Sequence, residues 1–562
     1  QKSDKTGQVR SCRMLSLGVH WLRMDRGAPE PAISSDTLDS WKAIAAHLSR
    51  DVRTVMRWER VRGLPVHRVP GGGKPGVCAL KCELDAWRKG TRLHLVEQAE
   101  RPVPQPLTPS IAVLPFANLS ADKENEYFSD GLADGIITDL ARIAALRVTA
   151  RTSSFSFRGK GQDVRDIGLT LGVSTVLEGS VQRSGRRVRV SAQLVNASDG
   201  FHLWSERFDR ELADVFAIQD EISGAIAAAL EVRLVPTPSS RRTTNPEAYH
   251  LWLKGRYYHR YESMEAIAGC RGCYEQAIAL DPSFPQPYLG LAELYRGLSD
   301  YGIVRPKDVG AQGWAAVQKA LELDDSLGEA YALSGTYRAW MDFDWKGAEA
   351  DFRRASVLNP AAVEAHWLRA MMCLLPLNRL EEAAHEMERA IELDPLSPLV
   401  HSYFAWLLAF KRESGRALEE IETALALDPE YAPALAIRGS VLYYADRVEE
   451  GAASWQSAVQ KMERAAVAIG ALGYGLALLG RKAEAQAILA ELDAGESTSY
   501  VSPVSRAWVY IGLGDFDTAF EWLDRAVDDR DPHILHFPSK PAYDPMRQDP
   551  RFSALLRRMR LA

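Results

Sequence analysis

Positive charge is concentrated in one short stretch of this chain. Residues 40–92 hold twelve Lys/Arg against four Asp/Glu, a net charge of +8, whereas the 562-residue chain as a whole has a formal net charge of −6. Long cationic side chains gathered in this way can neutralise the phosphates of a polyanion, so the stretch is predicted to bind nucleic acid. The candidate contacts are its polar donors: Lys42, Arg50, Arg53, Thr54, Arg57, Arg60, Arg62, His67, Arg68 and Lys74.

The spacing of apolar residues predicts the elements that hold these donors. A first helix over 40–49 would bury Trp41, Ile44 and Leu48, and a second helix over 52–61 would follow a short turn, with Asp51 as its N-cap. Residues 64–69 and 77–81 read as two strands around the turn "PGGGKPG", and 81–90 as a short last helix. The second helix then carries long donors toward a groove, and the glycine-rich turn carries Lys74 toward phosphate.

This order of helix, turn, helix, hairpin and helix resembles the MerR-like and excisionase-like winged helix-turn-helix family. The stretch "DVRTVMRWE" matches the recognition helix of that family, which implies binding to double-stranded DNA by Arg53, Thr54 and Arg57. MerR-type activators carry a dimerising coiled coil after this unit, whereas a Pro-rich segment follows here. A homodimer therefore stays among the alternatives only because operators usually have two-fold symmetry.

Residues 110–236 alternate between strand and helix patterns. Strands are expected over 110–116 and 146–151 and helices over 127–143 and 164–172; a hairpin with turns at 184–185 and 198–200 and a last helix within 201–230 follow. The pattern predicts a mixed α/β sandwich. Its long motifs, among them "YFSDGLADGIITDLAR" and "VLEGSVQRSGRRVRVSAQLVNASDGFHLW", resemble a domain of bacterial regulators related to the amino-terminal domain of TolB-type proteins. That domain joins a helix-turn-helix or an adenylate-cyclase module to tetratricopeptide repeats, and it brings no established catalytic centre.

No catalytic or metal-binding motif is evident. Asp130, Asp134 and Asp139 read as a charge bias near the start of a helix, and Ser153-Ser154 reads as a loop without a nearby base. Kinase, zinc-protease, nucleophile-elbow and cyclase patterns are missing. Cys270 and Cys273 have a two-residue spacing but no second pair to complete a zinc site. The sequence therefore predicts no enzyme, no catalytic residue, no metal and no cofactor.

The carboxyl-terminal half repeats. Five Asp or Asn residues follow apolar helical stretches with spacings of 43, 35, 35 and 34 residues, and they are Asp281, Asp324, Asn359, Asp394 and Asp428. A period near 34 residues built from two helices is typical of tetratricopeptide repeats, which this region resembles. The first spacing predicts an insertion near 298–308. The uncharged run 465–480 is too short to span a membrane and reads as a buried helix pair.

The predicted architecture is a multidomain α plus α/β protein with an all-α solenoid. Its parts are a flexible arm 1–37, a winged helix-turn-helix domain 38–94, a Pro-rich linker 95–109, the α/β domain 110–236, a linker 237–246, and a tetratricopeptide solenoid 247–562 with a C-terminal cap. Six cysteines and the absence of a secretion signal favour a reducing, cytoplasmic compartment and no membrane partner.

Two functions fit this architecture. In the first, the chain is a DNA-binding transcriptional regulator whose repeats take a protein or peptide in their concave groove and whose α/β domain couples or senses. In the second, it is a non-catalytic scaffold whose basic segment is a relic or a protein-docking surface. Binding to duplex DNA that depends on sequence favours the first function over the second.

Overall fold

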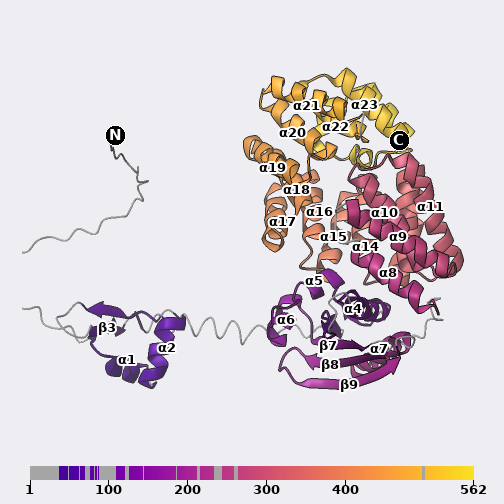
Figure 1. The fold of residues 1–562 in the computed structure, drawn as a ribbon. Helices are drawn as coiled ribbons and strands as arrows, with labels where there is room; N and C mark the ends of the chain where they lie inside the picture. Colours follow the sequence, from indigo (N-terminus) through magenta and orange to yellow (C-terminus); the bar gives the residue numbers. More distant parts are fainter. Residues whose placement is uncertain are drawn as a thin grey trace, which may run out of the picture. The chain divides into compact units, whose positions relative to one another are not determined.

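The computed structural model describes residues 37–87 and 109–561, apart from residues 49, 63, 70–75, 82, 85–86, 121–125, 144, 185–186, 212–214, 233–242, 259–263 and 497–499. The chain divides into two compact units, Gln1–Pro104 and Gln105–Ala562 (Figure 1). The predicted contact Lys74 and most of both predicted linkers lie outside the described residues.

The described residues of the first unit include the helices α1 (Trp41–His47) and α2 (Val52–Arg62) and an antiparallel sheet. The two helices follow the predicted pattern, and β2 (His67–Val69) pairs with β3 (Gly76–Leu80) as expected for a hairpin. Strand β1 (Thr37–Leu38), which the sequence did not predict, pairs with β3 on its other side. The core of the unit is formed by buried apolar residues from these elements and from the segments that follow them: Ile44, Ala45, Leu48, Val55, Leu64, Val77, Ala79 and Leu84.

The second unit begins with a mixed sheet of six strands. They are β4 (Ser110–Val113), β5 (Ala117–Asn118), β6 (Arg147–Val148), β7 (Thr175–Ser184), β8 (Arg187–Asn196) and β9 (His202–Glu211). The order is β6-β4-β7-β8-β9, with β5 also on β7; the pairs among β4 to β7 are parallel, and β7-β8 and β8-β9 are antiparallel. The sequence predicted the hairpin, but it did not separate β9 from the helix that follows it.

Helices cover both faces of this sheet because the interior strand β4 has apolar side chains on both of its sides. Helices α4 (Glu126–Ala141) and α7 (Val215–Ala229) share a core cluster with Ile111 and Val113 of β4. Helix α6 (Val164–Leu171) packs with Ala112 and Leu114 on the opposite face and ends at Gly172, whose φ of 62° is the left-handed conformation that glycine adopts easily. The expected loop around Ser153 is instead the short helix α5 (Arg151–Phe155).

The rest of the second unit is a stack of antiparallel helix pairs (Figure 1). In the described residues the pairs are α8 (Pro246–Tyr258) with α9 (Met264–Leu280), α10 (Gln286–Asp300) with α11 (Pro306–Leu323), α12 (Gly328–Tyr337) with α13 (Trp345–Leu358), α14 (Val363–Leu368) with α15 (Leu380–Leu393), α16 (Pro398–Phe410) with α17 (Ser414–Leu427), α18 (Ala432–Tyr444) with α19 (Val448–Lys461), α20 (Ala466–Leu478) with α21 (Lys482–Gly495), and α22 (Pro503–Leu513) with α23 (Phe516–Asp529). The π-helical turns η3 (Arg338–Asp342) and η4 (Arg369–Leu374) extend α12 and α14.

Most of the Asp and Asn markers act where the sequence placed them, at the end of the second helix of a pair. Asp281 and Asp324 accept hydrogen bonds from the backbone N–H two residues later, of Ser283 and Ser326, at 3.0 and 2.9 Å. This side-chain turn ends one helix and directs the chain into the next. The run 465–480 forms one buried helix, α20, rather than the expected helix pair, because its small residues continue a single helix to Leu478.

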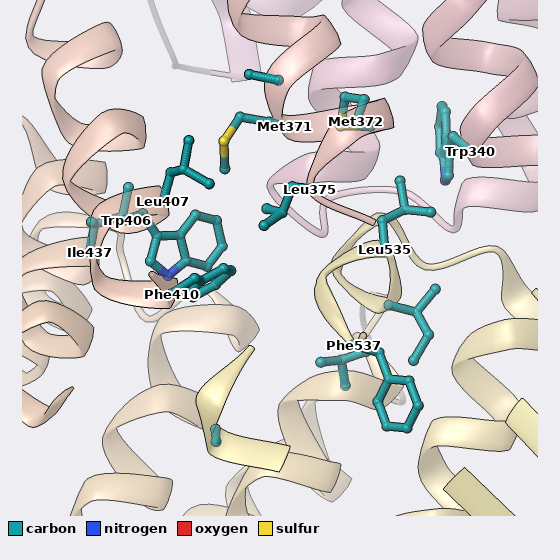
Figure 2. Packing of buried hydrophobic residues seen from close by; sticks show 14 of the residues in the cluster. Trp340, Met371, Met372, Leu375, Trp406, Leu407, Phe410, Ile437, Leu535 and Phe537 are labelled. Atoms are coloured by element: carbon teal, nitrogen blue, oxygen red, sulfur yellow. The ribbon is translucent and has the colours of Figure 1, made fainter. Parts of the chain in front are cut away.

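The chain ends by folding back onto the repeats. We name residues 530–547 the closing segment; it contains the 3-10 turns η5 (Pro532–His536) and η6 (Pro541–Met546) and leads into helix α24 (Pro550–Arg558). Leu535 and Phe537 of this segment are fully buried and share one core cluster with Trp340 of η3 and Phe410 of α16, as Figure 2 shows. Residues about 190 positions apart in the sequence are thereby in contact.

The first helix of each pair lies on the inner face of the stack, and we call these the inner helices. Glycines in two of them leave space for one bulky side chain, which gives a prediction about stability. Trp455 of α19 fits between Gly439 and Gly475, since a Cβ at either glycine would lie 2.4 or 2.6 Å from the indole ring. We expect Gly439→Ala to destabilise the second unit by about 1–3 kcal/mol through overpacking. Urea unfolding followed by far-UV circular dichroism measures this as a lower midpoint.

The matched control is a helical glycine with open space around it. Nothing lies within 4 Å of a Cβ built on Gly297 in α10, so Gly297→Ala gains helix propensity of up to about 1 kcal/mol without a clash. Its midpoint is expected at or above that of the wild type. A Gly439→Ala midpoint equal to that of Gly297→Ala would contradict the packing argument.

Candidate functional site

The first unit presents cationic side chains around the start of α2. Lys42 on α1, Arg50 in the turn and Arg53 on α2 are all exposed. The backbones of Arg57, Arg60 and Arg62 lie on α2 and that of Arg68 lies on β2, while their side chains lie outside the described part of the chain. Roles for all of these residues in DNA contact remain predictions.

The start of α2 is held by the predicted N-cap. Asp51 Oδ1 accepts from the backbone N–H of Thr54 at 2.8 Å, and Thr54 Oγ1 donates to Asp51 Oδ2 at 2.6 Å. The hydroxyl and the N–H of Thr54 both lower the pKa of the Asp51 carboxyl. Thr54 therefore has a structural task at the helix start in addition to the DNA contact that the sequence predicted for it.

His67 also has an internal partner. Its Nε2 lies 2.7 Å from Glu83 Oε2, and 54% of the His67 side chain is exposed. This carboxylate lies within the basic stretch. The predicted role of His67 toward DNA is accordingly shared with a contact inside the domain.

A second place of interest is the junction between the α/β domain and the repeats. Ser153 of α5 is fully buried, and both its N–H and its hydroxyl donate to Asp394 Oδ1, at 2.9 and 2.5 Å. Next to it, the N–H of Ala150 donates to the carbonyl of Leu393 at 2.9 Å. These hydrogen bonds attach the start of α5 to the end of α15 and the turn that follows it.

Asp394 is the one repeat marker of the five that serves another domain. In its repeat, the N–H two residues later, that of Leu396, donates to Ser153 Oγ at 2.8 Å. The Ser153 hydroxyl thus accepts from the Leu396 N–H and donates to Asp394. The other markers accept directly from the N–H two residues later. The sequence showed the marker but could not reveal this insertion, because the serine lies 241 positions away.

Ion pairs form a second attachment between the same parts. Asp130 and Asp134 of α4, which the sequence analysis read as a simple charge bias, are 4% and 7% exposed. Asp130 pairs with Arg158 and with Arg151 of α5, and Asp134 pairs with Arg151 and with Arg256 of α8, the first helix of the repeats. Buried carboxylates need such partners, so the cluster holds α4, α5 and α8 together.

The inner face of the repeats, where the sequence placed a partner groove, is partly covered by the closing segment. Trp340 Nε1 of η3 donates to the carbonyl of Arg530 at 2.5 Å, and Ser539 Oγ donates to the carbonyl of Leu375 at 2.7 Å. Arg412, after α16, pairs with Asp544. A peptide partner therefore cannot lie along this part of the face while the closing segment occupies it.

Other chemistry is sparse in the described residues. Within these residues no group of three or more His, Cys, Asp or Glu side chains could hold a metal ion. Cys270 and Cys273 are buried thiols on α9 without a disulfide, and burial raises the pKa of both. None of the helices in the described ranges is both long and apolar enough to cross a bilayer.

The junction generates a prediction on Ser153. Ser153→Ala removes the hydroxyl that joins Leu396 N–H to Asp394, so the half-buried N–H of Leu396 loses its partner and the buried carboxyl of Asp394 accepts one hydrogen bond fewer. We expect a loss of about 1–3 kcal/mol in the stability of the second unit, seen as a lower urea midpoint. Ser457→Ala, which changes an exposed serine on α19, is the control and should leave the midpoint unchanged. Equal midpoints for the two variants would rule out a stabilising junction.

Asp394 gives a prediction with a pH dependence. Burial raises the pKa of its carboxyl, although the hydrogen bonds from Ser153 oppose this. Because the pKa is higher in the folded state, the stability that Asp394 contributes is fully present below its unfolded pKa and is lost as the pH rises through its folded pKa. We therefore expect Asp394→Asn, which keeps the accepting oxygen, to be more stable than the wild type at pH 7. The gain should vanish as the pH falls toward the usual range of an Asp. A gain that instead grows toward acid pH would contradict this sign.

Comparison with known protein families gives two matches. Residues 107–224 match a family described as HilA/YgeH-like transcriptional regulator, second domain, and this range covers the α/β domain through most of α7. Residues 344–398 match the tetratricopeptide repeat, in agreement with the repeat period of the sequence.

Two kinds of curated protein are similar to this chain. Putative adenylate cyclase 3 of Rhizobium meliloti (strain 1021) is 38% identical over 253 residues, which make up 43% of this chain and 42% of that protein. Transcriptional regulator HilA of Salmonella typhimurium is 22% identical over 302 residues, or 52% of each chain. The chain thus spans about half the length, or less, of the curated relatives it matches.

The first relative corrects one prediction. The missing motifs predicted that this chain is not an enzyme, and a relative with the name of an enzyme at 38% identity contradicts that prediction. The prediction rested on missing motifs. A catalytic centre built from residues far apart in the sequence leaves no local motif, so their absence was not sufficient evidence.

Solved structures give only weak likenesses. A tetratricopeptide protein, YrrB, described as having an unusual peptide-binding site, is 22% identical with a TM-score of 0.24 and covers 35% of this chain and 96% of that chain. The human IFIT1 dimer with m7Gppp-AAAA is 14% identical with a TM-score of 0.40 and covers 56% and 81%. Neither likeness bears on function. The family matches do: this chain carries a HilA-like transcriptional-regulator domain and tetratricopeptide repeats.

Proposed function

We propose that this chain is a DNA-binding transcriptional regulator, with residues 38–94 as a winged helix-turn-helix domain that binds double-stranded DNA. The observation that carries the proposal is the match of residues 107–224 to the second domain of a family of transcriptional regulators. The HilA relative, which is named as a transcriptional regulator, supports the same reading. As part of this proposal the chain acts in the bacterial cytoplasm, where the chromosome lies.

The charge and geometry of the first unit support a role in DNA binding. Lys42, Arg50 and Arg53 are exposed near the start of α2, and the rest of the basic stretch adds to a net charge of +8. The Asp51 cap fixes the first turn of α2, so that Arg53 projects from an ordered backbone. An ordered helix with exposed donors at its start suits reading of base edges in the major groove.

The second unit supports a coupling role in the same proposal. The α/β domain, which we propose to span 110–236 and to be related to the amino-terminal domain of TolB-type proteins, is attached to the repeats of 247–562 at two places. A protein or peptide partner would bind the repeats on surface that the closing segment leaves uncovered. A homodimer would match the two-fold symmetry that operators usually have.

Loss of one arginine tests the DNA contact. We expect Arg53→Gln to weaken binding to duplex DNA selected from a random pool by about 10-fold and to relax the sequence preference, as loss of a base contact does. The wild type should show a steep dependence of affinity on salt, because binding releases counterions from phosphate. Fluorescence anisotropy at several salt concentrations measures both effects.

The control for this experiment is a lysine of the repeats. Lys482→Gln changes an exposed cation on α21 and should leave DNA affinity and its salt dependence unchanged. If Arg53→Gln and the double variant with Arg57→Gln bind the selected duplex as tightly as the wild type, the proposed recognition helix is wrong.

A tetratricopeptide scaffold is the second candidate, and the repeat match and the eight helix pairs of the described residues favour it. In this case the basic segment would dock acidic protein surface. DNA binding would then be weak, and the random-pool selection would return no preferred sequence. The same selection therefore distinguishes the two functions.

A further inference from the structure

The repeats and the closing segment line a cavity of about 200 Å³ that is partly open to solvent. Its walls come from the inner helices α10, α14, α16, α18, α20 and α22 and from η5 and the residues after it. Met371, Trp406 and Ile437, which Figure 2 shows close together, form part of one wall. The cavity therefore exists only where the closing segment meets the inner face.

The walls are largely aromatic. Trp367 and Tyr403 stack with ring centroids 5.4 Å apart, and Trp406 meets His536 edge to face at 4.6 Å. Tyr474 and Trp508 line the same space. Flat rings with offset and edge contacts favour a flat, apolar ligand body. A volume of about 200 Å³ is below that of typical drug-sized pockets and suits a ligand of one or two rings.

A buried amine faces this space. Lys540 is 6% exposed, and its Nζ lies 3.6 Å from the ring centroid of Trp508 and 5.6 Å from that of Trp406. In the described part of the chain no carboxylate pairs with Lys540. The two nearby acids are already engaged, because Asp300 pairs with Arg296 and Asp531 accepts from Ser502 and from the N–H of His533. Burial lowers the pKa of Lys540 to about 7.

Three further polar atoms at the cavity have no hydrogen-bond partner among the described residues: Trp406 Nε1 and Arg296 Nε, both donors, and Nδ1 of the His536 ring. Trp406 and His536 are each 8% exposed. Burial, then His533 and Lys540, lower the pKa of His536 well below its usual value, so the imidazole is neutral near pH 7. Buried polar atoms without a partner cost about 1–3 kcal/mol each, and a ligand that accepts hydrogen bonds recovers this cost.

We propose that this cavity is a binding site for a small aromatic carboxylate. Its ring system would lie among Trp406, Tyr403 and Trp508, and its carboxylate would pair with Lys540 and accept from Trp406 Nε1. Arg296 and Asp300, which also line the cavity in the described part of the chain, pair with each other, so the ligand should carry one negative charge. The ligand would contact both the closing segment and the inner helices, and it would hold the two together. The site is independent of DNA binding by the first unit.

The test compares an acid with its uncharged analogue. Isothermal titration calorimetry of the full chain at pH 6.5 uses naphthalene-2-carboxylate and naphthalene-2-carboxamide as probes, which have the same rings and differ in charge. We expect the acid to bind about 10-fold more tightly than the amide, as loss of one charge-assisted hydrogen bond implies. Failure of both probes to bind, or equal affinities, would overturn the proposal.

Variants locate the site. Lys540→Met keeps the length of the side chain over Trp508 but removes the charge, and it should reduce the affinity for the acid to that for the amide. Lys482→Met, on the exposed face of α21, should bind both probes as the wild type does. Unchanged acid affinity in Lys540→Met would overturn the proposal.

A second variant tests the cavity without touching the amine. Ala471 of α20 lines the space, and Ala471→Phe fills it. Circular dichroism and the unfolding midpoint establish that the variant folds, and binding of both probes should be lost. A folded Ala471→Phe that still prefers the acid as the wild type does would place the binding site elsewhere.

Discussion

The attachment of Ser153 to Asp394 is the interaction on which the arrangement of the second unit depends. Asp394 occupies the marker position at which Asp281 and Asp324 bind the turn of their own repeat, but it binds Ser153 of the α/β domain instead. The carboxylate is 3% exposed, so it cannot exchange Ser153 for water at small cost. Together with the pairing of Asp134 with Arg256 it joins the two parts at two places, and two separated attachments restrict rotation where one would leave a hinge.

Local signals in the sequence predicted much of the fold. The helices of the repeats, the Asx turns at Asp281 and Asp324, the Asp51 cap and the β2–β3 hairpin all depend on residues close together in the chain. Such interactions leave a regular spacing or a short motif, which a single sequence displays. One local element is an exception: where the sequence predicts a loop, the structure has α5, whose five residues are too few to show a helical period.

What the sequence could not display is contact between distant residues. Ser153 and Asp394, Trp340 and Arg530, and Ser539 and Leu375 are separated by 241, 190 and 164 positions. No period or motif links them, and the closing segment reads as an ordinary cap. The candidate cavity depends on that segment, so its lysine was invisible as a site residue. The prediction of no enzyme rested on missing motifs, and motifs report only local chemistry.

The closing segment also changes what kind of repeat protein this is. In an open solenoid each repeat contacts only its neighbours, so evolution can add or delete a repeat at little cost. Here η5 and η6 must meet η3, η4 and the end of α16, and an added repeat would shift one set of contacts past the other. A change in the number of repeats between the two ends would therefore break these contacts, and relatives that keep the closing segment should differ in loop length rather than in repeat count.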